Sequence, residues 1–268
     1  MIISKDDYEE PRCPLCMNTD KANIPISRVL EKLDEAFSKK DFDFAERLLD
    51  NWIAEAKAIG DNQGSLSLFN EKIGLYRKLN RKMECLAAID STLQMVEVLK
   101  LQNTLIGATS FINAATGYNA FELFDDAVSL YKRAENVLNN LPSCEDRLAA
   151  LYNNMASALV GQKNYDEADN AYNNAIQLLE HQSNSATELA ITYLNMADMI
   201  TAQYGYENVE GKVNTYLDKA ESLLDSVRQY DSYYAFVCEK CAPVFGYYGF
   251  FLTKNKFLKR AEDIYERT

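Results

Sequence analysis

The sequences FINAA at residues 111–115 and FDDA at residues 124–127 return 41 residues later as YNNMA at 152–156 and YDEA at 165–168. A third version of the first phrase, YLNMA, begins another 41 residues on, at position 193. Self-similarity at a fixed period of this length is typical of helical repeat proteins. Because each repeat buries its core against its neighbours, a chain of 268 residues can form one array, and we expect one elongated repeat domain over residues 26–268.

Apolar residues recur three and four positions apart from Ile26 onward, which predicts amphipathic helices. We expect an all-α chain of about six antiparallel helix hairpins. The expected repeats occupy residues 26–60, 66–99, 104–138, 145–180, 185–227 and 231–268. A small side chain early in each second helix lets paired helices approach closely and supports this alignment. These small residues are Ala45, Cys85, Ala127 and Ala168.

Several local signals predict where helices start and stop. Residues 61–65 form a polar break between the first two repeats, and residues 204–211 form a longer turn inside the fifth. Ser185 with Glu188 three residues later predicts a capping box that opens the fifth repeat. Pro243 removes a backbone donor, so we expect it to kink its helix or begin a second one.

The charge balance limits the classes of partner. The chain holds 28 Lys and Arg against 40 Asp and Glu, a net charge of −12. A field of this sign repels nucleic acid and anionic membrane surfaces and favours a basic or neutral protein segment. No stretch approaches the roughly 18 to 20 consecutive apolar residues of a membrane span. We therefore expect a cytoplasmic protein with reduced cysteines.

The repeated phrases and the small residues of the second helices resemble those of the tetratricopeptide family. The standard unit of that family has about 34 residues, whereas the period of 40 to 42 here is similar to its kinesin-light-chain-like branch. The resemblance covers roughly residues 26–268. It implies a right-handed superhelical α-solenoid whose first helices line a concave groove that binds extended peptides or helices. The implied function is a non-enzymatic scaffold for protein–protein interaction.

One asparagine recurs at the same helical position in three repeats: Asn113, Asn154 and Asn195. By the resemblance this position faces the groove. An amide offers an acceptor and two donors, so a row of amides can pair with the main chain of an extended peptide. The alternative is that each Asn bonds an adjacent repeat. Neighbouring candidates for selecting the peptide sequence are Asn153, Thr116, Asn119, Ser157 and Asp198.

Two Cys-x-x-Cys pairs, Cys13/Cys16 and Cys238/Cys241, together hold the four thiolates of a structural zinc site. Such a site requires the N-terminal arm to fold back or two chains to meet. It defines an alternative function, a metal- or thiol-stabilised structural or oligomerisation module. The other interpretation of Cys238 and Cys241 is two small thiols packed in a core.

The two ends of the chain raise further possibilities. Residues 1–25 are acidic, contain three prolines and lack a helical period, so we expect an irregular arm that can occupy the groove of its own chain. The aromatic stretch at residues 243–251 is mostly core, and its surplus can form a cap, a homodimer contact or an aromatic end of the groove.

Catalysis finds little support in the sequence. The chain has a single histidine, His181, and no Gly-rich phosphate loop. We therefore expect no enzymatic activity and no cofactor other than the zinc considered above. A sensor of a small signalling peptide is a further alternative, because the same groove would serve it.

Overall fold

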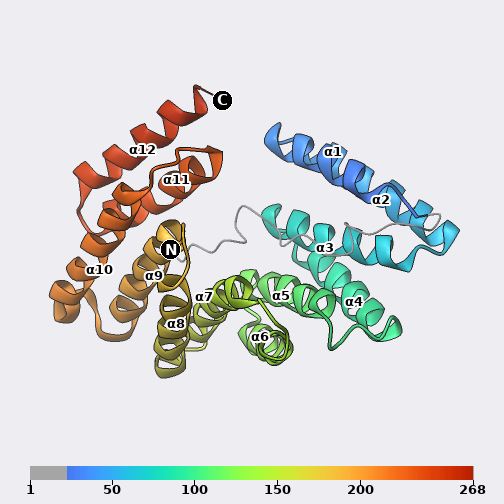
Figure 1. Ribbon diagram of the computed structural model, residues 1–268, viewed down its shortest axis with the longest axis horizontal. Coiled ribbons are helices and arrows are strands. Elements are labelled where there is room, and N and C mark those ends of the chain that lie inside the picture. The colour runs from blue at the N-terminus through green and yellow to red at the C-terminus, as the bar shows by residue number, and fades with distance from the viewer. Residues whose placement is uncertain (1–22, 268) are drawn as a thin grey trace. The chain divides into compact units, whose positions relative to one another are not determined.

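The computed structural model describes residues 23–267. Over these residues the chain forms twelve α-helices and no strand (Figure 1). It divides into two compact units with a boundary between Cys144 and Glu145. We call residues 23–144 the N-terminal unit and residues 145–267 the C-terminal unit. Within the described range, no helix is both long enough and apolar enough to cross a membrane.

The N-terminal unit consists of three helix hairpins. The first helix of each pair packs on the second, and successive pairs are joined by contacts of α2 with α3, α4 with α5 and α3 with α5. The helices are α1 (Ile26–Ser38), α2 (Phe42–Ile59), α3 (Asn62–Lys78), α4 (Lys82–Val98), α5 (Leu105–Ala120) and α6 (Phe124–Asn139).

The C-terminal unit repeats this pattern. Its hairpins are the pairs α7 with α8, α9 with α10, and α11 with α12, and α9 also contacts α7, α8 and α11 (Figure 1). The first helices α7, α9 and α11 are thus neighbours. The helices are α7 (Glu145–Gly161), α8 (Tyr165–Glu180), α9 (Ala186–Tyr204), α10 (Tyr206–Ser226), α11 (Ser232–Tyr247) and α12 (Phe251–Tyr265).

The small residues that align the second helices are buried as expected. Ala45, Cys85, Ala127 and Ala168 all have no exposed surface. Hairpin packing at these positions leaves no room for a larger side chain, which explains why the sequence keeps them small.

Two expected boundaries are wrong in detail, and one of the two alternatives for Pro243 is excluded. The polar break at residues 61–65 shrinks to Asp61, whose Oδ1 caps α3 by accepting from the Gly64 amide at 2.8 Å. The turn expected at residues 204–211 is the single residue Gly205, whose φ of 77° lies in the region that favours glycine. Pro243 does not begin a second helix, because α11 continues through it to Tyr247.

First and second helices differ in how they are buried. In α5 every residue from Gly107 to Gly117 is buried, whereas α6 buries one stripe of its surface. Helices α3, α5, α7 and α9 are enclosed because each one packs against its own partner and against a neighbouring repeat. Polar side chains on α3, α5, α7 and α9 are therefore drawn into the interior, where they need partners.

Two equivalent tyrosines show what such partners contribute. The hydroxyl of Tyr131 on α6 lies 3.0 Å from Thr116 Oγ1 on α5. Tyr172 occupies the same place one repeat later, on α8, and its hydroxyl has no hydrogen-bond partner among the described residues. Burial raises the pKa of Tyr172 far above the ordinary value, so the hydroxyl stays protonated.

Removing these two hydroxyls is expected to have opposite effects. Tyr131→Phe should lower the free energy of unfolding by about 0.5 to 1.5 kcal/mol, because a hydrogen bond is lost. Tyr172→Phe should raise it by about 1 kcal/mol, because an unpaired buried hydroxyl is removed. Urea denaturation followed by circular dichroism measures both. Destabilisation by Tyr172→Phe would show that its hydroxyl has a partner.

Candidate functional site

The three repeated asparagines are almost completely buried. Asn113 on α5, Asn154 on α7 and Asn195 on α9 are 2%, 3% and 1% exposed. Asn113 Nδ2 donates to Asn70 Oδ1 on α3, at 3.1 Å. This bond links two successive repeats of the N-terminal unit, as the alternative interpretation of the asparagines describes. Contact of Asn113, Asn154 or Asn195 with a peptide stays a prediction.

Asn70 is a fourth member of this row that the sequence did not reveal. It lies 43 rather than 41 residues before Asn113, in LFNEK at residues 68–72, which lacks the alanine of the other phrases. Its Nδ2 also donates to Ser110 Oγ at 3.2 Å and to Leu66 O at 3.0 Å. The Asn70 side chain therefore holds α3 to α5 through Ser110 and Asn113.

The residues expected to select a peptide sequence differ in accessibility. Thr116 is buried and its hydroxyl is engaged with Tyr131 and with Ile112 O at 2.9 Å. Asp198 is half-buried and accepts from the Tyr248 hydroxyl at 2.8 Å. Asn119 on α5 and Ser157 on α7 are also half-buried. Thr116 and Asn119 belong to the N-terminal unit, and the other candidates belong to the C-terminal unit.

A cavity of about 460 Å³ lies in the C-terminal unit. It is bounded by the first half of α7, the connection between α8 and α9, and the first turns of α9. Asn153 is the member of the expected peptide-selecting residues that lines this cavity. The described residues that line it are Asp146, Ala150, Asn153, Leu179, His181, Gln182, Ser183, Asn184, Ser185, Glu188 and Ile191.

Two buried polar atoms of the cavity residues lack hydrogen-bond partners among the described residues: Asn153 Oδ1 and Gln182 Nε2. Asn153 is 8% exposed, and its Nδ2 donates weakly to Ala149 O at 3.4 Å. Leaving a buried acceptor or donor unpaired costs about 1 to 3 kcal/mol. A ligand that supplies one donor and one acceptor would relieve this cost.

The capping box predicted for α9 is absent. The Ser185 hydroxyl donates to Leu179 O at 2.7 Å instead of capping α9, and Glu188 Oε1 accepts from the Tyr233 hydroxyl of α11 at 2.8 Å. Glu188 is therefore held at the cavity by a neighbouring hairpin. The sequence did not identify Asp146 or Glu188 as cavity residues, although both are acids in the first turn of a first helix and lie 42 residues apart.

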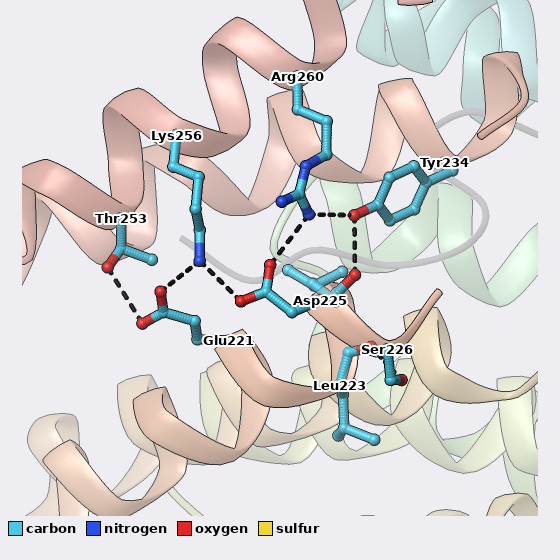
Figure 2. Close-up of polar contacts among 9 residues, drawn as sticks. Glu221, Leu223, Asp225, Ser226, Tyr234, Thr253, Lys256 and Arg260 are labelled. Atoms are coloured by element: carbon cyan, nitrogen blue, oxygen red, sulfur yellow. Dashed lines mark hydrogen bonds and ion pairs between the residues drawn. The ribbon is translucent and has the colours of Figure 1, made fainter. Parts of the chain in front are cut away.

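A network of ionic and hydrogen bonds ties together the last three helices (Figure 2). Lys256 of α12 bonds Glu221 and, at 2.8 Å, Asp225 of α10. Arg260 Nη1 lies 3.0 Å from Asp225 and donates to the Tyr234 hydroxyl of α11 at 2.7 Å. This network fixes α12 on α10 and α11.

The network makes stability depend on pH in a defined direction. Desolvation opposes the charge of Asp225, but hydrogen bonds from Lys256 and Arg260 outweigh it and lower the pKa of the carboxyl. A lowered pKa in the folded state contributes stability that is present above the ordinary pKa of about 3.9 and is lost as pH falls through the lowered value. Acidification below about pH 4 should therefore weaken this end of the C-terminal unit.

Asp225→Asn is expected to lower the melting temperature at neutral pH and to flatten its decline on acidification, because the carboxylate contribution is already lost. Melting temperatures measured between about pH 2 and pH 7 test this. Asp218→Asn, at an exposed position of the same helix, is the control and should keep the wild-type profile. An Asp225→Asn profile that parallels wild type at every pH would contradict the assignment.

Cys238 and Cys241 lie on α11 with no exposed surface. Burial raises the pKa of Cys238 to about 11 and also raises that of Cys241, so both sulfur atoms are held as thiols. The pair thus packs as a small part of the core. Cys13 and Cys16 lie outside the described residues, as does most of the N-terminal arm, so the four-cysteine zinc site stays a prediction.

The C-terminal aromatic stretch is divided between core and surface. Phe245 and Tyr248 are buried, and the Phe245 ring packs on Phe257 with centroids 5.5 Å apart. Tyr247, Phe251 and Leu252 are 77%, 62% and 87% exposed. A homodimer contact through these exposed residues stays a prediction.

Comparisons with known proteins identify the fold. No protein-family model matches the chain, and no curated protein matches it by sequence. Among solved structures, BtubC from P. vanneervenii is 17% identical with a TM-score of 0.66, over 76% of this chain and 83% of BtubC. NprR in complex with its cognate peptide NprX is 15% identical with a TM-score of 0.59, over 92% of this chain and 69% of NprR.

The apo form of RapI is also similar, at 10% identity and a TM-score of 0.58, over 93% of this chain and 86% of RapI. Structural similarity at identities this low is evidence for the fold alone and not for function. Together with the packed helix hairpins, these similarities show that the chain has a tetratricopeptide-like helical-repeat fold, an α-solenoid.

Proposed function

We propose that the chain is a non-enzymatic cytoplasmic scaffold that binds an extended peptide segment of a partner protein along the first helices of its C-terminal unit. The observation that carries this proposal is the cavity between α7 and α9, where Asn153 Oδ1 is buried without a hydrogen-bond partner among the described residues. An extended peptide has a free main-chain N–H at every second residue to offer such an acceptor.

The arrangement of the first helices supports this site. Because α9 contacts both α7 and α11, an extended segment can cross several repeats of the C-terminal unit. Half-buried Ser157 and Asp198 lie on two of these helices, where they can distinguish peptide side chains. In this proposal the buried asparagines Asn154 and Asn195 position the helices, and Asn153 contacts the peptide.

A sensor of a short signalling peptide is a second candidate. It is favoured by the likeness to NprR, whose structure was solved with its cognate peptide. A free peptide of fewer than about ten residues that raises the melting temperature of the chain would support the sensor. A requirement for the intact partner protein would support the scaffold.

Selection of binders from a random octapeptide library, followed by isothermal titration calorimetry, tests peptide binding. We expect peptides of micromolar affinity or better, and we expect Asn153→Ala to weaken them about twofold to tenfold because one hydrogen bond is lost. The control is Asn173→Ala, which removes an exposed amide from α8 of the same unit and should leave affinity unchanged. Recovery of no binder, or equal affinity of Asn153→Ala and wild type, would contradict the proposal.

A further inference from the structure

We propose that the cavity between α7 and α9 selects a positively charged residue, arginine or lysine, in the bound peptide. This inference rests on the proposed peptide binding and adds the class of residue that the cavity accepts. It identifies Asp146 and Glu188 as specificity-determining residues.

The charges at the cavity favour a cation. Asp146 stands in the first turn of α7 and Glu188 in the first turn of α9, where the positive ends of the helix dipoles stabilise carboxylates. Both residues line the cavity, and none of the described residues that line it is a lysine or an arginine. An anionic ligand would meet two like charges, whereas a guanidinium or ammonium group would be attracted to both.

Two hydrogen bonds fix the orientation of the Glu188 carboxylate at the cavity. The Tyr233 hydroxyl donates to Oε1 at 2.8 Å, and the Thr187 hydroxyl donates to Oε2 at 2.6 Å. These two bonds fix the orientation of the carboxylate, and its negative charge remains to attract a cation. A carboxylate that is fixed before binding loses little conformational entropy when the ligand arrives.

The unpaired amide atoms complement a peptide main chain. Asn153 Oδ1 needs a donor and Gln182 Nε2 needs an acceptor, and a main chain offers both N–H and C=O groups. A bare cation would satisfy Asn153 but not Gln182. The volume of about 460 Å³ lies within the range of about 300 to 1,000 Å³ that is usual for ligand cavities, so one long side chain fits.

The test asks whether neutralising a positive charge of the peptide weakens binding only when the Asp146 and Glu188 carboxylates are present. Peptides selected from the octapeptide library on wild-type protein are resynthesised with each arginine replaced by citrulline and each lysine by norleucine, one position at a time. Their dissociation constants are measured on wild type, on Asp146→Asn/Glu188→Gln and on Asp166→Asn/Glu167→Gln. The last pair is the control, because it removes two exposed carboxylates from the first turn of α8 in the same unit.

We expect one basic position at which neutralisation weakens binding to wild type and to the control variant at least about tenfold. The same neutralisation should change binding to Asp146→Asn/Glu188→Gln by less than about twofold. Peptides that bind wild type tightly without a basic residue, or an equal loss on all three proteins, would overturn the charge selection and leave peptide binding intact. If the library yields no binder, the proposed function and this inference fail together.

Discussion

Gly107→Ala is expected to lower the free energy of unfolding of the N-terminal unit by at least about 1 to 3 kcal/mol, the usual cost of overfilling a packed interior. A Cβ atom at this position of α5 would lie 2.1 Å from Leu101 O and 2.9 Å from the Leu101 carbonyl carbon. Both are backbone atoms, so a side-chain rotation cannot relieve the overlap. The turn before α5 must shift, which also weakens the 3.2 Å cap from the Gly107 amide to Thr104 Oγ1.

Gly211→Ala is the matched control, because Gly211 also lies in a helix, α10, and a Cβ there meets no atom within 4 Å. Alanine at an open helical position stabilises by about 0.5 to 1 kcal/mol relative to glycine. The two substitutions should therefore change the free energy of unfolding in opposite directions. Chemical denaturation of both measures the difference, and a tolerated Gly107→Ala would show that α5 does not approach the preceding turn as closely as described.

Asn70→Ala is expected to lower the free energy of unfolding by about 2 to 4 kcal/mol. The substitution removes the partner of Asn113 Nδ2 and a partner of Ser110 Oγ, and each buried group left unpaired costs about 1 to 3 kcal/mol. The three side chains are 3%, 2% and 0% exposed, so water cannot replace the lost bonds. Urea denaturation monitored by circular dichroism provides the measurement.

Two further variants make this result interpretable. Asn173→Ala removes an exposed asparagine that donates to Asp169 at 3.0 Å, and it should change stability by less than about 0.5 kcal/mol. The double variant Asn70→Ala/Asn113→Ala should cost less than the sum of its single variants, because each single variant removes the same bond. Additive costs would contradict a direct hydrogen bond between Asn70 and Asn113.

The sequence predicted the repeats well because their signals are local. The aromatic and alanine residues of FDDA and YDEA recur every 41 residues, and α6 and α8 begin at their first residues, Phe124 and Tyr165. One boundary error, at residues 61–65, lies where a tertiary contact forms. Helix α3 begins directly after Asp61, whose Oδ2 also accepts from the Ile24 amide at 3.0 Å. Ile24 lies 37 positions back in the chain, so this contact is not visible in the local sequence.

The candidate site was less predictable because the first helices are enclosed on most sides. Periodicity identifies Asn113 and Asn154 as equivalent, but it does not show whether an amide faces solvent or the next repeat. Asn153 was found because it adjoins the repeated asparagine. Gln182 lies in a connection without periodicity, so its place in the lining of the cavity emerges only from packing.

Hydrogen–deuterium exchange of the full chain, with and without a library-selected peptide, tests the central claim most directly. We expect the peptide to slow exchange in α7, in residues 181–185 and in the first turns of α9, which bound the cavity. Slowed exchange confined to residues 23–144, or to α10 and α12, would place the peptide elsewhere and contradict binding along the first helices of the C-terminal unit.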